Sequence, residues 1–368
     1  MKKQKITYEQ SGVNYGSLDP AKKLGQEAAK KTANNIKKAG FPEVSDSRGE
    51  SAFVWSVGNK YMAAITESLG TKNLVADATR EITGKTYYEI IGHDTVASAV
   101  NDLVSVGARP LTVHAFWAVG DSNWFNDLPR IKDLVKGWED ACNLSGATWG
   151  GGETPSYNDI VNKQTIALGS SVVGIIKNKK RLLSDKNLKV GDRIILLKST
   201  GVNANGISLT RKIAKKLSKG YATRLPSGKF YGEALLTKTN IYAMLVQDIL
   251  DKGIDLHYIS NITGHGLRKV MRARSTFSYV LEHIFEPQEV FLFIQKHAGM
   301  DDYDMYHTYN MGQDYAIFLP EKDVKKTLAI IKKHKFQGID AGYVKKGEKQ
   351  VVIEPKNITF KGDTLDLR

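Results

Sequence analysis

The sequence predicts an α+β protein of two domains, the first over residues 1–180 and the second over residues 181–368. Its 368 residues are enough for two or three domains. Both halves mix β-branched and aromatic runs, typical of strands, with apolar residues at helical spacing. Between them, residues 178–190 form a polar, charged stretch that ends at Gly191 and Asp192, which is typical of a domain boundary.

In the first half, strands and helices are expected to mix. A Gly58–Asn59 turn signal between two strand-like stretches predicts a β-hairpin. Val96, Val100 and Leu103 lie on one face of a predicted helix. The expected elements are a helix at 20–39, strands at 52–56 and 61–66, a helix at 94–106, a strand at 111–119, a helix at 127–144 and a strand at 165–177.

The second half is expected to repeat this mixture of elements. Residues 193–198, RIILLK, form a short apolar run of the kind found in buried strands. After this strand the expected elements are helices at 207–217, 239–252 and 290–298, a strand at 315–319, a helix at 322–334 and short strands at 351–353 and 358–360.

Composition and charge exclude several classes of protein. The single cysteine, Cys142, excludes a disulfide framework and a cysteine-based zinc cluster, and it fits a reducing compartment. No apolar run is long enough for a membrane span and the first residues lack a secretory signal, so we expect a cytoplasmic protein without a membrane partner.

The net charge of +14 does not by itself identify a partner. The excess consists mostly of lysines in short, scattered clusters, whereas nucleic-acid binders gather basic and aromatic residues on one element. We therefore expect a solvated basic surface first, attraction of small anionic substrates second, and no nucleic acid.

Five stretches place glycine beside polar residues where a helix or strand should end. Glycine lets the backbone approach a ligand closely, and the N–H groups at a helix start bind phosphate. The five stretches cover residues 69–72, 92–110, 149–155, 201–206 and 263–266.

The first two stretches suggest a nucleotide and a metal. Residues 69–72 are either a strand-to-helix turn or part of a phosphate-binding loop, although they lack Walker A spacing. Asp94 is placed at a helix start, where it is either an N-cap or a ligand. Because Asn101 and Asp102 follow about two turns later on the same face, the carboxylates suit Mg²⁺ and nucleotide phosphates.

The other three stretches are expected to be loops. Three glycines before Glu153 are costly inside a strand, so residues 149–155 are either a ligand loop or a linker. Asn203 and Asn205 serve either a ligand or a turn. His265, between two glycines, is expected to face a cleft and titrate near neutral pH, or to lie on an exposed loop. No G-x-S-x-G, H-E-x-x-H or G-x-G-x-x-G motif is present, which argues against those enzyme classes.

Taken in order, these stretches resemble a known family. Asp102, Gly107, Ala108 and Pro110 match the D-x4-G-A-x-P signature of the aminoimidazole ribonucleotide synthetase superfamily. Further segments, over about residues 8–320, resemble its PurM-type cyclo-ligases in particular: Tyr8 with Gly12–Asn14, Gly70–Lys72, Gly152–Thr154, Gly191–Asp192, Gly201 with Asn205–Gly206, Ser208–Ile213, Leu235–Tyr242, Thr263–Gly266 and Thr308–Gly312.

The resemblance implies a PurM-like architecture and an ATP-dependent ligase of purine biosynthesis. In such a homodimer the N-terminal domains pair their sheets into a barrel, which C-terminal α/β sandwich domains flank. ATP, with Mg²⁺, phosphorylates the formamide oxygen of formylglycinamidine ribonucleotide; the amidine nitrogen then closes the imidazole ring as phosphate leaves.

The resemblance also implies roles for particular residues. Asp102, Lys72 and His265 are the catalytic candidates, and Asp94 and Asp102 the metal ligands. The predicted nucleotide-binding residues are Gly70, Thr71, Lys72, Asp94, Asn101, Asp102, Gly107, Ala108, Gly151, Gly152, Glu153 and Thr154. The predicted substrate-binding residues are Gly201, Asn203, Asn205, Gly206, Thr263 and Gly264.

This chain departs from the family pattern at several sites. Glu67 stands where the family usually has Asp, and Asn203 where it has a histidine with a catalytic role; His265 or His93 is a candidate replacement for that imidazole. Relatives that need a thiol near either end are excluded. A kinase similar to thiamine monophosphate kinase and a non-catalytic nucleotide-binding scaffold remain alternatives.

Overall fold

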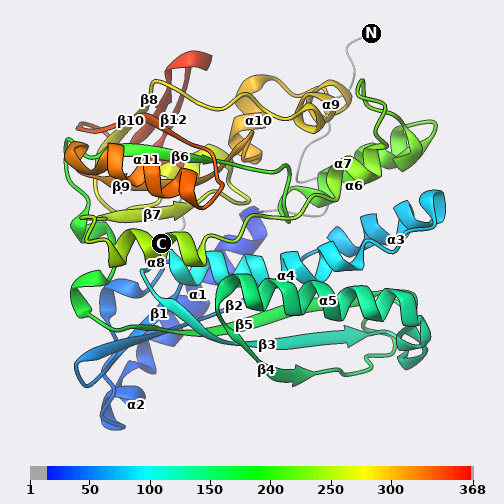
Figure 1. Cartoon of the computed structure of the whole chain (residues 1–368), viewed down its shortest axis with the longest axis horizontal. Helices are drawn as coiled ribbons and strands as arrows, with labels where there is room; N and C mark the ends of the chain where they lie inside the picture. Colours follow the sequence, from blue (N-terminus) through cyan, green and yellow to red (C-terminus); the bar gives the residue numbers. More distant parts are fainter. Residues whose placement is uncertain (1–14, 366–368) are drawn as a thin grey trace.

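The computed structural model describes residues 15–365 and arranges them around two β-sheets (Figure 1). Tyr8 and residues 12–14 of the family pattern lie outside the described residues. The strands are β1 (Phe53–Val57), β2 (Lys60–Ser68), β3 (Arg109–Val119), β4 (Thr148–Glu153), β5 (Ile166–Ile176), β6 (Arg193–Lys198), β7 (Tyr258–Asn261), β8 (Phe277–Leu281), β9 (Gln313–Leu319), β10 (Gly338–Lys346), β11 (Gln350–Ile353) and β12 (Ile358–Lys361).

Each sheet is built from one part of the chain. The first has the order β1-β2-β5-β3-β4 and the second the order β12-β11-β8-β10-β6-β9-β7. Neighbouring strands are antiparallel except for the parallel pairs β3–β4 and β8–β11. The chain passes from one sheet to the other between Ile176 and Arg193, across the charged stretch where the sequence predicts a boundary.

Helices cover the sheets and fill the space between them (Figure 1). The predicted helices at 127–144, 207–217, 290–298 and 322–334 are present within a few residues. The helices at 72–83, 231–235 and 302–308 were not predicted from the sequence. The helices are α1 (Tyr15–Lys31), α2 (Ala33–Lys38), α3 (Lys72–Thr83), α4 (Tyr88–Val104), α5 (Leu128–Ser145), α6 (Ile207–Lys216), α7 (Tyr231–Leu235), α8 (Ala243–Asp251), α9 (Glu289–Ala298), α10 (Asp302–Thr308) and α11 (Val324–Lys333).

Helix α4 lies at the centre of the molecule and is buried along most of its length. It packs against α5, β2, β5 and, from the second half of the chain, α8. Its apolar residues, such as Val100 and Leu103, pack in the core, whereas the buried polar residues Asp94 and Asn101 form hydrogen bonds with the second half of the chain. The prediction that the helix starts at Asp94 is wrong: it starts at Tyr88, and Asp94 lies inside it.

Two glycines let α4 and α5 approach closely. A Cβ added at Gly92 would lie 2.4 Å from the carbonyl oxygen of Leu134, and one added at Gly137 would lie 1.9 Å from the carbonyl oxygen of Glu89. Since neither distance is possible for a carbon atom, the spacing of the two helices depends on glycine at both positions.

The predicted loop at 149–155 is wrong, because most of it forms the edge strand β4. Gly152 is needed where β4 approaches β3, because a Cβ added there would lie 2.2 Å from the Ala115 carbonyl oxygen. The pairing also shifts register between Val113 and Ala115. Close backbone approach therefore explains glycine here, as it does in other strands where a neighbour comes near.

The helix expected at 239–252 begins four residues late, at Ala243. The residues before it, 237–242, have no regular secondary structure, and hydrogen bonds hold them to α4 and to Lys72 at the start of α3. We call residues 237–242 the interdomain segment, because it joins the second half of the chain to the central helix of the first.

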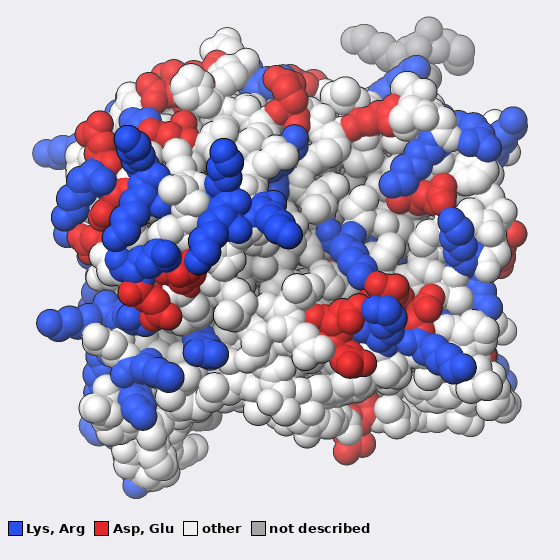
Figure 2. Space-filling view, viewed as in Figure 1, with Lys and Arg blue, Asp and Glu red and all other residues white. Residues whose placement is uncertain are grey.

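Charged side chains are spread over the face drawn in Figure 2, where cations alternate with anions. Lysines are densest over the region of α11, which carries Lys325, Lys326, Lys332 and Lys333. Among residues 15–365, no helix combines the length and the apolar character that crossing a membrane requires.

Substitution of Gly137 by alanine should destabilise the fold, because the new methyl group would overlap the Glu89 carbonyl oxygen. We expect Gly137→Ala to lower the free energy of unfolding by about 1–3 kcal/mol in urea denaturation. The matched control is Gly25→Ala in α1, where an added Cβ meets no atom within 4 Å. A Gly137→Ala protein as stable as the control would refute the close packing of α4 on α5.

Candidate active site

A cavity of about 750 Å³ lies where the two halves of the chain meet. Its walls come from α1, the end of β2, the turn into α3, the middle of α4, the loop before α6 and the loop after β7. The polar or charged side chains that line it are Lys22, Gln26, Glu50, Ser51, Glu67, Ser68, Thr71, Ser98, Asn101, Asp102, Asn203, Asn205, Ser208, Thr239, Asn261, Thr263, His265, Lys269, Arg272 and Asp314.

Two helices begin at the wall of this cavity. Helix α3 follows the lining residues Gly70 and Thr71, and α6 follows Gly206, whose φ of +80° only glycine adopts readily. Free N–H groups and the positive end of the helix dipole make such positions suitable for phosphate. Two threonines of the cavity lining, Thr71 and Thr239, have buried hydroxyls without a hydrogen-bond partner among the described residues.

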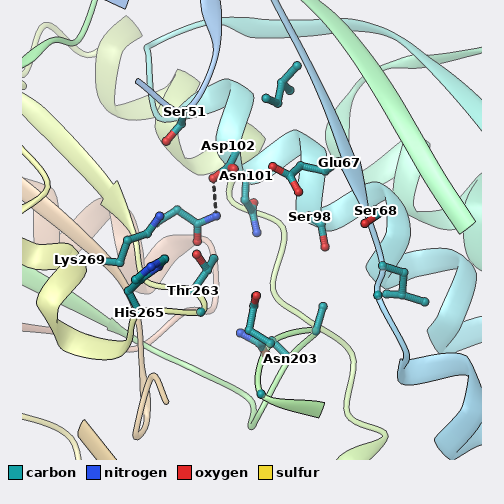
Figure 3. Close-up of a pocket in the computed structure, with 18 of the residues that line it drawn as sticks. Ser51, Glu67, Ser68, Ser98, Asn101, Asp102, Asn203, Thr263, His265 and Lys269 are labelled. Atoms are coloured by element: carbon teal, nitrogen blue, oxygen red, sulfur yellow. Dashed lines mark hydrogen bonds between the residues drawn. The ribbon is translucent and has the colours of Figure 1, made fainter. Parts of the chain in front are cut away.

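Two carboxylates face each other in the cavity (Figure 3). Glu67 comes from β2 and Asp102 from α4; Asn261 Nδ2 donates to Asp102 Oδ1 over 2.8 Å. Burial, and then the negative charge of Asp102, raise the pKa of Glu67 to about 7, against the opposing effect of Lys269. Two carboxylates that repel each other in this way are a suitable pair of oxygen ligands for a divalent cation.

Lys72 and Asp94 are fully buried and do not line the cavity. Lys72 Nζ lies 2.5 Å from Asp94 Oδ2 and donates to the Thr237 carbonyl oxygen over 2.8 Å. Asp94 Oδ1 accepts from the Thr239 N–H over 2.8 Å. Both Asp94 oxygens are therefore occupied by protein groups, so this geometry does not support a metal-binding role for Asp94 or a phosphate-binding role for the Lys72 side chain.

Asn101 lines the cavity and also forms hydrogen bonds with the interdomain segment. Its Oδ1 accepts from the Tyr242 N–H over 3.0 Å, and its Nδ2 donates to the Asn240 carbonyl oxygen over 2.8 Å. Together with Lys72 and Asp94, it fastens the interdomain segment to the first half of the chain.

The sequence predicts that His265 titrates near neutral pH, and this prediction is wrong. Burial and the nearby charges of Lys269 and Arg268 lower the pKa of His265 to about 2, although the side chain borders the cavity. Burial also lowers the pKa of His93, whose Nε2 lies 2.8 Å from the Thr239 carbonyl oxygen. Burial therefore favours the neutral form of both imidazoles, and His93 lies outside the cavity lining.

The fold brings together just over half of the residues predicted for the site. Those that line the cavity are Gly70, Thr71, Asn101, Asp102, Asn203, Asn205, Gly206, Thr263, Gly264 and His265. They come from turns and from one helix face, which is why glycine-containing turns were an informative signal.

Other predicted residues lie elsewhere. Gly107 and Ala108 form the turn after α4, where a Cβ added at Gly107 would lie 2.2 Å from the Arg181 carbonyl oxygen, so this glycine serves packing. Gly201 packs against Thr237. Gly151, Gly152, Glu153 and Thr154 belong to β4 and its end; Gly152 and Glu153 border a separate hollow of about 810 Å³ on the first sheet.

Several lining residues were not predicted from the sequence. For Glu67 the sequence did contain a signal, because this residue stands where the family usually has Asp. Lys269 and Arg272 come from the short helix η7 (Gly266–Met271) and the residue after it, and Asp314 from β9. These residues follow no local motif, because only the tertiary fold carries them to the cavity.

Solved structures with similar folds are known. The HypE–HypF complex contains a chain with a TM-score of 0.59 and 18% identity, covering 85% of this chain and 92% of that one. The structure titled AaThiL complexed with AMPPCP and TMP has a TM-score of 0.58 and 14% identity, covering 85% and 90%. At these identities the similarity establishes a shared fold.

Sequence comparison is more specific. Phosphoribosylformylglycinamidine cyclo-ligase of Methanosarcina barkeri is 31% identical over 332 residues, covering 90% of this chain and 93% of the relative. The protein of the same name from Methanosarcina acetivorans is 32% identical over 328 residues, covering 89% and 92%. The N-terminal domain of AIR synthase related protein matches residues 49–176, and its C-terminal domain matches residues 189–354. The chain therefore belongs to the AIR synthase related family.

Proposed function

We propose that this protein is a phosphoribosylformylglycinamidine cyclo-ligase, which uses ATP to close the imidazole ring of aminoimidazole ribonucleotide in purine biosynthesis. The observation that carries the proposal is that similarity to relatives of this name spans about 90% of the chain and so includes nearly every element that lines the cavity. Because purine biosynthesis is a metabolic role, we expect this enzyme to be located in the cytoplasm.

The cavity suits two phosphate-bearing ligands. The starts of α3 and α6 supply N–H groups, and Lys22, Lys269 and Arg272 supply positive charge around the same space. We assign ATP and the phosphate of the ribonucleotide to this cavity. Phosphoryl transfer depends mainly on positioning and charge neutralisation, so the proposal requires no covalent nucleophile.

Glu67 and Asp102 are the residues that would hold Mg²⁺. The raised pKa of Glu67 reflects an electrostatic cost that a cation would relieve. Among residues 15–365 no cluster of three or more metal-binding side chains occurs, which fits an ion that takes its remaining ligands from water and phosphate. When bound, Mg²⁺ would neutralise negative charge on the phosphates.

Amide and hydroxyl groups complete the substrate site. Asn203 and Thr263 lie across the cavity from α4 (Figure 3), and Asn205 also lines it. Their side chains can orient the ribose and the amidine through hydrogen bonds. The amidine nitrogen must be held close to the formamide carbon, since ring closure depends on this approach.

A second copy of this chain is the partner that we assign to the open face of the first sheet. Helices α4 and α5 cover one face, whereas on the other face His114, Phe116, Gly169 and Ser171 line the 810 Å³ hollow. Phe116 is 41% exposed and contacts the ring of Tyr157. An exposed aromatic residue on an open sheet face is typical of an interface, and pairing of two such faces would form the barrel that the family resemblance implies.

The substrate can be tested directly. With ATP and formylglycinamidine ribonucleotide, the purified protein should release ADP and aminoimidazole ribonucleotide in equal amounts, measured by a coupled ADP assay and by diazotisation of the aminoimidazole. Thiamine monophosphate is the control substrate, since a kinase with this fold would phosphorylate it. ADP release with thiamine monophosphate, and none with the amidine, would refute the proposal.

Asp102→Asn should reduce turnover by about a hundredfold or more, because it removes a carboxylate charge where phosphates and metal meet. The amide can still bond to Asn261, so we expect the melting temperature to change little. Glu321→Gln, on an exposed residue before α11, is the control and should retain full turnover. Loss of folding in Asp102→Asn would instead identify Asp102 as a structural residue.

The dimer can be tested at Phe116. Phe116→Glu places a charge on the open sheet face and should convert the dimer to a monomer in sedimentation velocity experiments. The control is Leu292→Glu, on a residue of α9 that is 52% exposed and lies in the other half of the chain. If both variants sediment as the unchanged protein does, this face is not the interface.

A further inference from the structure

Asp314 is buried at the start of β9 and borders the cavity, yet no motif pointed to it. Its Oδ1 accepts from Asn203 Nδ2 over 2.5 Å, and its Oδ2 accepts from the Tyr242 hydroxyl over 2.9 Å. Its carbonyl oxygen accepts from the Ile262 N–H over 2.9 Å. Asp314 therefore connects the loop at 201–206, the interdomain segment and the loop after β7.

The carboxylate decides which way the Asn203 amide points. A carboxylate only accepts hydrogen bonds, whereas an amide has a donating NH₂ group on one side and an accepting oxygen on the other. Because Asp314 takes the NH₂ group of Asn203, the amide oxygen must point the other way. Burial raises the pKa of Asp314 to about 6, so the group is mostly a carboxylate at a pH of about 7.5 and above.

The oxygen of Asn203 remains available for a ligand. Its protein partner is the Thr200 hydroxyl at 3.5 Å, the outer limit of a hydrogen bond. Figure 3 shows Asn203 reaching into the cavity from the wall opposite Ser98 and Asn101. The backbone at Asn203 has a φ of +59°, a conformation that Asn tolerates better than most residues. The conformation of the Asn203 backbone and the hydrogen bond to Asp314 together fix the orientation of the Asn203 side chain.

We propose that Asp314 is a positioning residue, and that through it Asn203 presents its amide oxygen Oδ1 as an acceptor for an N–H group of the substrate. The inference rests on the proposed function, whose substrate carries an amidine. An amidine donates N–H hydrogen bonds, whereas the corresponding amide has a carbonyl oxygen in place of the amidine imine nitrogen. A fixed acceptor would repel that oxygen, so the pair selects the amidine over the amide.

This assignment gives Asn203 a role different from that of the histidine found there in the family. A neutral amide does not take up a proton, so Asn203 orients the reacting nitrogen and leaves proton transfer to another group. Asp314 acts only through Asn203 and Tyr242, since its own oxygens are both occupied.

The test is a double-mutant cycle at the two positions. In Asp314→Asn the new amide can donate to Asn203, so the Asn203 amide can turn and present its NH₂ group to the cavity. We expect KM for the amidine ribonucleotide to rise about tenfold or more, while KM for ATP stays within about twofold. The protein should also lose selectivity against the amide ribonucleotide.

The exchanged pair provides the control. Asn203→Asp alone places two carboxylates together and should also impair substrate binding. In the double variant Asn203→Asp with Asp314→Asn, the new amide at position 314 donates to one carboxylate oxygen at position 203, and the other oxygen faces the cavity. KM for the amidine should then recover toward the unchanged protein. A purely structural role predicts equal changes in both KM values, and that result would overturn the inference.

A second measurement separates this inference from the proposed function. In ¹⁵N-labelled protein, the side-chain NH₂ group of Asn203 should exchange slowly with solvent, and this protection should disappear in Asp314→Asn. If the unchanged protein fails to turn over the amidine substrate, the proposed function is refuted, whereas the amide signal still decides the positioning role. An Asn203 signal that is equally protected in both proteins would refute the positioning role.

Discussion

The buried ion pair between Lys72 and Asp94 is the interaction on which the active site depends most. It lies on the first half of the chain, but Lys72 donates to Thr237 and Asp94 accepts from Thr239, so the pair fastens the second half to α4. Removing one partner of a buried pair costs about 3–5 kcal/mol, because the other charge is left without compensation. The alignment of the two cavity walls therefore depends on two buried charges that lie outside the cavity lining.

From this attachment a continuous set of hydrogen bonds extends to the opposite wall. Asn101 holds the backbone of Tyr242, whose hydroxyl reaches Asp314, which in turn orients Asn203. The groups that would contact a nucleotide and those that would contact the ribonucleotide are thus parts of one hydrogen-bonded structure. Such preorganisation matters for a reaction that depends on positioning rather than on a reactive side chain.

Local signals in the sequence were sufficient for much of the fold but for only part of the site. The hairpin of β1 and β2 was predicted because a turn signal and strand-forming residues lie next to each other, and α5 because its apolar spacing is regular. Strand β4 was missed because Gly150 and Gly152 reflect contact with β3, which only the tertiary fold creates. Likewise, the partners of Asp94 come from residues 72 and 239, so no local pattern distinguishes it from an N-cap or a metal ligand.

The distribution of charge around the cavity has a consequence for any attempt to divide the protein. The first half of the chain contributes three carboxylates and one lysine, and the second half contributes two cations and one carboxylate. These residues are Glu50, Glu67, Asp102 and Lys22 from the first half, and Lys269, Arg272 and Asp314 from the second. Because Lys72 is neutralised by Asp94, it cannot offset those carboxylates. Expressed alone, the first half would present mainly a repulsive surface to a nucleotide, so the two modules are electrostatic complements and not interchangeable parts.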